Sequence, residues 1–252
     1  MRTIGGHASR RHALSALEDA RSATGGSWPR HVAIVSDGSA RWAHARGLSI
    51  GDGHEAAADT VVARIGDAIE LGIEELTLYA FSTENWTRPE GEVEELLGML
   101  ARRIAADAPA LHELGVRVRF IGRRDRGGSE LAEQMRVAEE LTAGNRDLRV
   151  YVAFDYGGRD EIVRAALRFK DGGEDTFARL LNDGEMRDPD LVIRTGGEQR
   201  LSNFLLWQAA YAELLFREEL WPDFDRLALE ECLEQYGERR RRFGGRDSAV
   251  RV

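Results

Sequence analysis

The chain has 252 residues, 42% of them hydrophobic, with a formal net charge of −9 and a single cysteine. This length and apolar content suit one α/β domain with a sizeable core, and the negative charge argues against general nucleic-acid binding. No apolar run approaches the roughly eighteen residues of a membrane span, and the lone Cys232 excludes an intramolecular disulfide, which fits a cytoplasmic location.

Strand and helix signals alternate along the chain. Short apolar runs predict strands at residues 31–36, 76–81, 116–121, 148–154 and 190–193. Amphipathic patterns predict helices at residues 55–71, 90–105, 131–141, 159–168 and 204–216. This order predicts an α/β fold with a central, mostly parallel sheet flanked by helices. We expect a flexible N-terminal segment at residues 1–27, one domain at residues 28–245 and a C-terminal tail at residues 246–252.

Polar residues follow the first predicted strand. Asp37 and Gly38 come directly after it, and Ser39, Ala40, Arg41 and Trp42 follow. A glycine at the beginning of a helix lets backbone N–H groups approach an anion. A carboxylate beside an anion is explained if Mg²⁺ lies between them, because Mg²⁺ binds through carboxylates and substrate phosphates. A simple turn with a helix cap is the alternative interpretation.

Two further loops begin where predicted strands end. The loop after residue 81 carries hydroxyl, carboxylate, amide, indole and guanidinium groups: Ser82, Thr83, Glu84, Asn85, Trp86 and Arg88. The loop after residue 193 carries Arg194, Gly196, Gly197, Arg200, Leu201 and Ser202. Arginine forks and hydroxyls on a glycine-rich loop are typical phosphate ligands. Because strand ends meet at one edge of a parallel sheet, these loops predict two phosphorylated substrates bridged by a metal.

The sequence blocks that contain these loops resemble the cis-prenyltransferase family, the undecaprenyl diphosphate synthase-like enzymes. The blocks are HVAIVSDGSARWA at residues 31–43, LTLYAFSTENWTRP at 76–89, YGGR at 156–159, DPDLVIRTGGEQRLSNF at 188–204, AYAEL at 210–214 and RRFG at 241–244. The resemblance implies a homodimer in which each subunit's sheet and helices enclose an apolar tunnel. It also implies a Mg²⁺-dependent coupling of an allylic diphosphate with isopentenyl diphosphate that forms a Z double bond.

The same resemblance implies a role for each matching residue. Asp37 would hold Mg²⁺ and Glu213 would be the second metal-associated carboxylate. Polar groups for phosphate and proton handling would be His54, Ser82 and Asn85. The allylic diphosphate would lie on Gly38, Arg41 and neighbouring backbone, and the phosphates of the C5 unit on Arg194, Arg200 and Ser202. The RRFG segment would reach towards the partner subunit. We expect helices at residues 56–69 and 93–104 to line the tunnel, including Leu96, Leu97, Leu100 and Ala101.

Several positions depart from the family pattern. Ser39 stands where asparagine is usual, Ile50 where a basic residue is common, and Asp155 where asparagine is common. In one interpretation the protein is an ordinary elongating enzyme that takes C5 to C15 primers. In a second, it joins two dimethylallyl-type diphosphates head-to-middle and gives a lavandulyl-like diphosphate. A non-catalytic subunit of a heteromeric synthase is a remote third, because the Asp37 and Arg194 loops are retained. We expect at most peripheral membrane contact.

Overall fold

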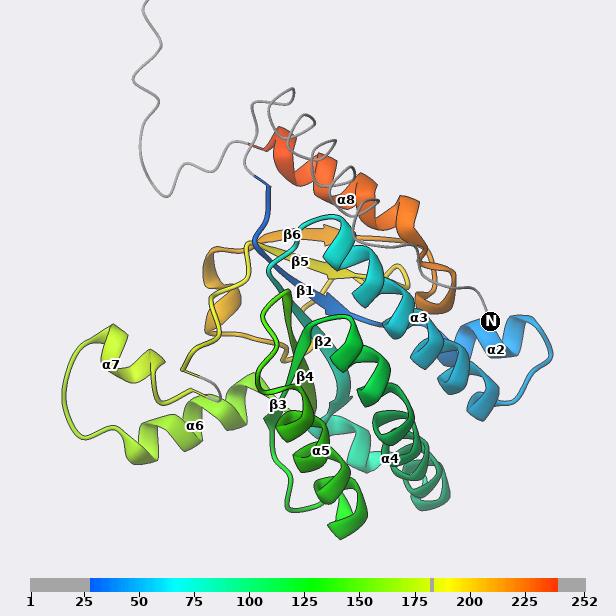
Figure 1. Ribbon diagram of the computed structural model, residues 1–252, viewed down its shortest axis with the longest axis horizontal. Coiled ribbons are helices and arrows are strands. Elements are labelled where there is room, and N and C mark those ends of the chain that lie inside the picture. Colours follow the sequence, from blue (N-terminus) through cyan, green and yellow to red (C-terminus); the bar gives the residue numbers. More distant parts are fainter. Residues whose placement is uncertain (1–27, 182–183, 240–252) are drawn as a thin grey trace, which may run out of the picture.

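The computed structural model describes residues 28–181 and 184–239. The sequence expectations for residues 1–27 and for the segment from residue 240 onward therefore lie outside the described residues. One six-stranded sheet, entirely parallel, organises the fold in the order β3-β4-β2-β1-β5-β6 (Figure 1). Its strands are β1 (His31–Val35), β2 (Glu75–Ser82), β3 (Val116–Gly122), β4 (Leu148–Tyr156), β5 (Leu191–Arg194) and β6 (Glu213–Phe216).

Helices connect the strands and cover the sheet. They are α2 (Ser39–Ala45), α3 (Ile50–Glu70), α4 (Glu90–Glu113), α5 (Gly128–Thr142), α6 (Gly158–Arg168), α7 (Glu174–Ala178) and α8 (Arg226–Glu238). Three short 3₁₀ segments are η1 (Thr83–Thr87), η2 (Gln208–Tyr211) and η3 (Trp221–Asp223). None of the helices within the described ranges combines the length and apolar character needed to cross a bilayer.

Alternation along the strands divides the core between the two faces of the sheet. In β1, Val32 and Ile34 belong to a core cluster that also contains side chains of α3, α4, α5 and α8, while Ala33 and Val35 belong to a second cluster that includes Phe204. All four β1 side chains are at most 6% exposed. A strand buried on both faces reads as a continuous apolar run, which is why residues 31–36 were recognisable from sequence.

The predicted helix at residues 204–216 is wrong. Its last four residues form strand β6, which pairs in parallel with β5, and the residues before them form an irregular loop followed by η2. Leu205 has a φ of 44°, which is incompatible with a right-handed helix. The apolar pattern of residues 204–216 led to a wrong helix prediction, because Phe204 and Leu205 are fully buried by packing in the cluster on one face of the sheet and do not form one stripe of a helix.

The helices at residues 50–70 and 90–113 are both longer than predicted. Helix α3 begins at Ile50 because Ser49 is its N-cap: the Asp52 N–H donates to Ser49 Oγ at 3.0 Å, and Asp52 Oδ2 accepts from the Ser49 N–H at 3.0 Å. This reciprocal capping box stabilises the first turn. Helix α4 continues through an exposed proline, Pro109, to Glu113.

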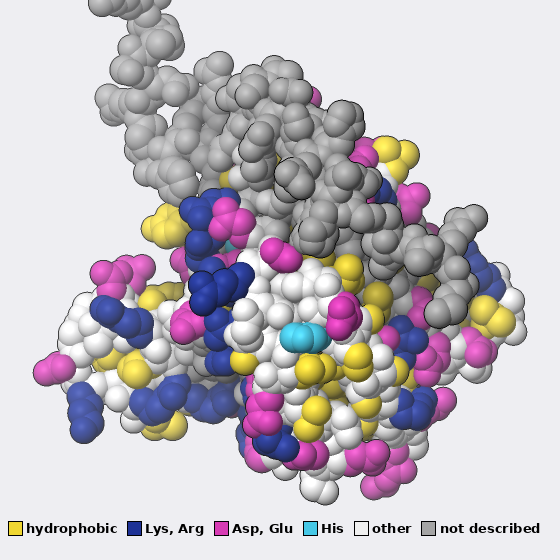
Figure 2. All heavy atoms as spheres, in the orientation of Figure 1, with side chains coloured by type: hydrophobic (Ala, Val, Ile, Leu, Met, Phe, Trp, Pro, Cys, Tyr) yellow, Lys and Arg dark blue, Asp and Glu magenta, His cyan; other side chains and the backbone are white. Residues whose placement is uncertain are grey.

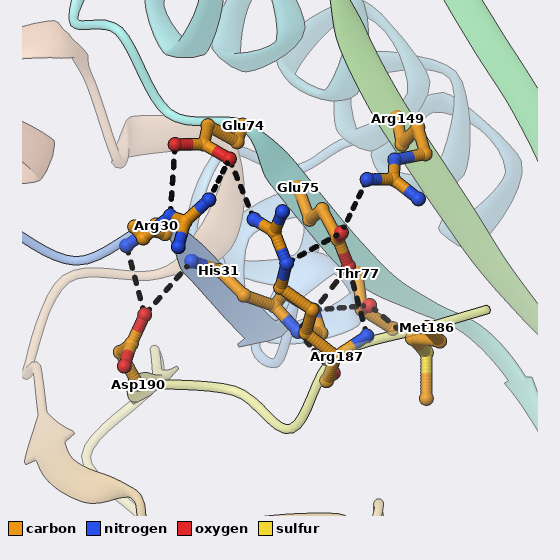
Figure 3. Close-up of polar contacts among 9 residues, drawn as sticks. All are labelled: Arg30, His31, Glu74, Glu75, Thr77, Arg149, Met186, Arg187 and Asp190. Carbon is orange, nitrogen blue, oxygen red and sulfur yellow. Dashed lines mark hydrogen bonds and ion pairs between the residues drawn. The ribbon is translucent and has the colours of Figure 1, made fainter. Parts of the chain in front are cut away.

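A buried charged network closes the amino-terminal edge of the sheet. Glu75 has a fully buried side chain and lies 3.0 Å from Arg149 Nη2 and 3.6 Å from Arg187 Nε (Figure 3). His31 Nδ1 lies 2.7 Å from the Arg187 carbonyl oxygen, so this nitrogen carries the proton, and Nε2 accepts from Thr77 Oγ1 at 2.8 Å. Burial lowers the pKa of His31 to about 4, which keeps the imidazole neutral at pH 7.

Candidate active site

Asp37 follows β1 at the carboxyl edge of the sheet, and its backbone is fixed from two sides. Its N–H donates to Thr195 Oγ1 at 3.0 Å, and its carbonyl accepts from Thr195 Oγ1 at 2.8 Å and from the Trp221 N–H at 3.0 Å. The next residue, Gly38, has a φ of 111°, and a Cβ there would lie 2.8 Å from the Leu220 side chain. The sequence Asp-Gly therefore meets both a conformational and a steric requirement.

Two guanidinium groups hold the Asp37 carboxylate. Arg194 Nη2 donates to Oδ2 at 2.7 Å, and Arg41 Nη2 donates to Oδ1 at 3.3 Å. Arg41 also donates to the Gly196 carbonyl at 2.8 Å, and a Cβ on Gly196 would lie 2.6 Å from Arg41 Nη2. Two cations on one carboxylate give this group of three side chains a net positive charge. Such a charge attracts an anionic ligand.

Arg194 also has a donor that no protein group uses. The residue is 5% exposed, and within the described part of the chain its buried Nε has no hydrogen-bond partner. Its Nη1 donates to the Arg200 carbonyl and to Ser202 Oγ, both at 2.6 Å. An unpaired buried donor is costly, and a bound anion would satisfy it.

The loop that receives Arg194 has strained backbone. Ser202, Asn203 and Leu205 have φ values of 48°, 66° and 44°. Each such residue costs about 1–3 kcal/mol and persists only where the surroundings hold it. The burial of Leu205 and the bond from Arg194 Nη1 to Ser202 provide that support. Backbone strain of this kind concentrates at functional sites, which strengthens the assignment of this loop to ligand binding.

The η1 segment lies against the same loop. Asn85 Oδ1 accepts from the Ser82 N–H at 2.8 Å, which fixes the amide at the end of β2. Asn203 Nδ2 donates to Glu84 Oε1 at 2.9 Å, while Asn203 Oδ1 accepts from the Arg159 N–H at 2.9 Å. Asn203 therefore joins η1, the strained loop and the beginning of α6. This role was not predictable from the sequence, because a loop asparagine belongs to no periodic pattern.

Trp86 is anchored away from the cavity by a buried carboxylate. Its Nε1 donates to Asp155 Oδ1 at 2.8 Å, and Arg126 Nε donates to Asp155 Oδ2 at 2.8 Å. The Arg126 guanidinium carbon lies 5.0 Å from the centre of the Trp86 ring. Asp155 is fully buried with a φ of 44°, a conformation that Asp and Asn tolerate best among non-glycine residues. The three side chains hold η1 in position.

His54 lines the cavity from the second turn of α3. Burial, followed by the nearby charge of Arg88, lowers the pKa of His54 below its usual value. The imidazole is therefore neutral near pH 7. Arg88 itself donates to Glu92 Oε1 at 3.0 Å.

These groups line one end of a cavity of about 970 Å³. The polar end includes Asp37, Arg41, His54, Asn85 and Arg194. The remainder is bounded mainly by apolar side chains of α3, α4 and strands β2 to β4, among them Ala57, Val61, Ile65, Leu96, Leu100, Val118 and Val150. A charged end that continues into an apolar volume fits an amphipathic ligand with an anionic head and a hydrocarbon tail.

Comparison with known proteins identifies the family. The family described as "Putative undecaprenyl diphosphate synthase" matches residues 35–244. The chain belongs to this cis-prenyltransferase family. An isoprenyl transferase of Aquifex pyrophilus is 49% identical over 221 residues, covering 86% of this chain and 96% of the relative. An isoprenyl transferase of Agrobacterium fabrum is 46% identical over 240 residues, covering 91% and 97%.

Two solved cis-prenyltransferase-like structures share the fold. Lavandulyl diphosphate synthase from Lavandula x intermedia, in complex with dimethylallyl diphosphate, superposes with a TM-score of 0.83 at 35% identity, covering 86% of this chain and 98% of that one. A "probable undecaprenyl diphosphate synthase" from Campylobacter jejuni superposes with a TM-score of 0.75 at 32% identity, covering 86% and 99%. Together with the sequence relatives they confirm the predicted α/β fold and a prenyltransferase activity.

The structure brings most of the predicted site residues of this cis-prenyltransferase to the cavity. Twelve line it: Asp37, Gly38, Ser39, Ala40, Arg41, His54, Ser82, Glu84, Asn85, Arg88, Arg194 and Ser202. Trp42, Thr83, Trp86, Arg200 and Leu201 are not among the residues that line it. Trp42 Nε1 donates to Asp223 Oδ1 at 2.7 Å, which ties α2 to η3, and Arg200 Nη1 donates to Glu198 Oε2. The Arg200 side chain is 60% exposed.

Glu213 is not brought to Asp37 within one chain. It begins β6 and pairs in register with Leu191, the first residue of β5, whereas Asp37 follows the strand end where Val35 pairs with Arg194. Glu213 Oε2 accepts from Arg239 Nη1 at 2.8 Å. Within the described ranges no three His, Cys, Asp or Glu side chains gather as a metal site. Any cation held by Asp37 would therefore need further oxygen ligands.

Proposed function

We propose that the protein couples an allylic diphosphate with isopentenyl diphosphate and forms a Z-configured polyprenyl diphosphate. The observation that carries this proposal is the Asp37 carboxylate, held by Arg194 and Arg41 at the charged end of a largely apolar cavity. The charged end suits two diphosphates, and the apolar remainder suits the prenyl chain, acting as the tunnel expected from the sequence. Holding both substrates together removes part of the entropic barrier, up to about 7–11 kcal/mol for ideal alignment.

The residues at the charged end divide into groups with different roles. Arg194, with its unused Nε, and Ser202 suit the diphosphate of the incoming C5 unit. Gly38 and Arg41 suit the allylic diphosphate, with backbone N–H groups at the beginning of α2 adding partial positive charge. Arginine forks match phosphate oxygens in pairs, which fixes the orientation of the substrate as well as its charge.

The donor set at Asp37 fits Mg²⁺ only when substrate is present. One carboxylate, 30% exposed, faces a cavity that the Ser36 and Ser39 hydroxyls also line. Mg²⁺ typically binds through one or two carboxylates plus substrate phosphates, so Asp37 with a diphosphate is a sufficient set. When bound there, the ion would neutralise the negative charge of the departing diphosphate. Glu213 remains a proposed metal-associated residue, and it would have to come from a second copy of the chain.

The coupling needs three changes at the substrates. The allylic C–O bond breaks and diphosphate leaves, the double bond of the C5 unit attacks the resulting cation, and a proton leaves the C5 unit. Arg194 and Arg41 stabilise the charge on the departing diphosphate. His54, Ser82 and Asn85 line the cavity beside them, and the neutral imidazole of His54 is available to accept a proton near pH 7.

A second candidate is head-to-middle coupling of two dimethylallyl-type diphosphates. It is favoured by the similarity to lavandulyl diphosphate synthase and by Ser39 and Ile50, which line the cavity where the family usually has an amide and a cation. The higher identities to isoprenyl transferases favour ordinary elongation instead. A non-catalytic subunit is disfavoured, because the Asp37 and Arg194 contacts are intact.

Product analysis separates these candidates. The protein is incubated with Mg²⁺ and labelled isopentenyl diphosphate plus C5, C10 or C15 allylic primers, and in a parallel tube with dimethylallyl diphosphate alone. We expect Z-polyprenyl products in the first set only. A lavandulyl-like product from the second tube would support head-to-middle coupling, and no product from any tube would overturn the proposed activity. Replacing Ser39 by asparagine is expected to change the rate or the product, and an unchanged profile would make that departure irrelevant.

We also propose that the protein acts as a homodimer in the cytoplasm. The separation of Glu213 from Asp37 within one chain supports a contribution from a second copy. On the face drawn in Figure 2, basic side chains lie beside acidic ones, which does not suggest a nucleic-acid groove. Light scattering coupled to size-exclusion chromatography tests the dimer, and a monomeric mass with full activity would exclude it.

A further inference from the structure

Helix α4 presents a stripe of side chains to the apolar part of the cavity. Leu96, Leu100, Ile104 and Leu111 belong to it, and their spacing places them on one helix face. Arg103 and Asp107 belong to the same stripe and also line the cavity, together with Ala108. The apolar pattern of α4 is therefore interrupted by two charged residues.

The two charged residues pair with each other, and Arg103 also pairs with a carboxylate on α3. Arg103 Nε lies 3.2 Å from Asp107 Oδ2, and Arg103 Nη2 donates to Asp59 Oδ1 on α3 at 2.7 Å. The Arg103 and Asp107 side chains are 25% and 27% exposed, whereas Asp59 is 72% exposed. Burial raises the pKa of Asp107 above its usual value. Arg103 therefore joins a solvent-exposed partner on α3 to a carboxylate that lines the cavity.

Along α4 the backbone of this pair lies well past the charged end, while the Arg103 guanidinium reaches towards α3, where its Nη1 lies 3.9 Å from Glu55 Oε2. Glu92 lies near that end on α4, and Arg103 and Asp107 follow it by eleven and fifteen residues. At 1.5 Å per residue the pair lies about 17–23 Å further along the helix axis. One turn beyond Asp107, the apolar side chain of Leu111 again lines the cavity.

We propose that the Arg103–Asp107 pair sets the length of the prenyl product. This inference rests on the proposed function. A hydrocarbon chain that reaches the pair displaces the remaining water from both charged groups and offers no hydrogen bond in exchange, which is unfavourable. Each added C5 unit up to that point is buried against apolar side chains, whereas the next unit meets charge. Elongation therefore slows where the chain reaches Arg103.

The test replaces both charged side chains and measures product length. In the double variant Arg103→Met/Asp107→Ala, methionine keeps a long side chain without charge. We expect the most abundant product, made from a C15 primer and excess isopentenyl diphosphate, to lengthen by at least one C5 unit. The variant Arg103→Lys keeps the charge and is expected to retain the wild-type length. An unchanged length distribution in the double variant would overturn the inference.

A matched control distinguishes the loss of charge inside the cavity from the loss of ion pairs between α3 and α4. The variant Arg102→Met/Asp59→Ala makes the same two kinds of substitution at exposed positions outside the cavity, and it breaks the Arg102–Glu55 and Arg103–Asp59 ion pairs between α4 and α3. We expect wild-type product length and rate. If this control lengthens the product as much as the cavity-lining variant does, loosened packing and not charge is responsible, and the inference fails.

Two further results keep the outcomes distinct. If wild-type protein makes no prenyl product, the proposed function fails irrespective of Arg103. If the double variant unfolds, as judged by circular dichroism, Asp107→Ala alone is assayed, with a smaller shift to longer product expected. No shift in that folded single variant would contradict the inference.

Discussion

The two edges of the sheet use the same kinds of residue for different purposes. At the carboxyl edge, Asp37 is held by Arg194 and faces a cavity. At the amino edge, Glu75 lies between Arg149 and Arg187 with no exposed side-chain surface. Both are carboxylates between two arginines. One remains open to a ligand, and the other is enclosed by the protein (Figure 3).

The difference lies in exposure and in what the neighbouring backbone does. Asp37 is 30% exposed and is followed by Gly38 in a left-handed conformation, so a ligand can approach closely. Glu75 is the first residue of β2, and it pairs in register with His31 of β1 and with Arg149 of β4. A carboxylate between two arginines therefore indicates a functional site only when it is also accessible from a cavity. The following predictions test that distinction, from the largest expected effect to the smallest.

Replacing Asp37 by asparagine should reduce kcat by about 1000-fold, the upper range for loss of one preorganised electrostatic group at a reaction centre. The free energy of unfolding should change little, because Arg194 and Arg41 keep backbone partners at Arg200 and Gly196. Steady-state kinetics with labelled isopentenyl diphosphate and urea denaturation measure the two quantities. Wild-type turnover in the variant would exclude Asp37 from the reaction.

Replacing Glu75 by glutamine should have the opposite result. Glutamine removes the negative charge from a fully buried site and places an amide N–H group there, facing Arg149 and Arg187 without an acceptor, which costs about 2–3 kcal/mol. We therefore expect a large loss of stability in urea, with kcat close to wild type at a temperature where the variant is folded. A stable variant with impaired kcat would show that the amino edge takes part in the reaction.

His31 predicts a pH dependence of stability. Its folded-state pKa of about 4 lies below the unfolded value of 6.5, so between these values the unfolded chain binds the extra proton. Stability contributed by neutral His31 is present above pH 6.5 and is lost as the pH falls towards 4, by roughly 3 kcal/mol. The raised pKa of Glu75 acts in the opposite direction. Urea denaturation at pH 7 and pH 5 should show a smaller loss in His31→Gln than in wild type, and equal losses would contradict the assignment.

Replacing Asp155 by asparagine should have the smallest effect. Asparagine accepts the Trp86 hydrogen bond and tolerates a φ of 44°, while Arg126, whose side chain is 38% exposed, can be solvated when its ion pair is lost. We expect a loss of about 1 kcal/mol in stability and a kcat within a few-fold of wild type. A loss of activity comparable to that of the Asp37 variant would mean that the negative charge itself is required at η1.

Periodic features of this chain were predictable and irregular ones were not. Strands such as residues 31–36 are visible in the sequence as continuous apolar runs, because both of their faces are buried. Asp37-Gly38 is recognisable because it directly follows one of these runs. The loop around Asn203 and Leu205 has left-handed backbone that depends on tertiary contacts, so residues 204–216 were mistaken for a helix. Arg103 was missed for a different reason: an arginine in an amphipathic helix usually points to solvent.

The most direct test of the account is a crystal structure with isopentenyl diphosphate, a non-reactive allylic thiodiphosphate and Mg²⁺. The account predicts both diphosphates at the carboxyl edge, one in contact with Arg194 and Ser202 and the other beside Gly38 and Arg41, with metal density at Asp37. Phosphorus and metal density elsewhere, with the Asp37 carboxylate still enclosed by its two arginines alone, would contradict it.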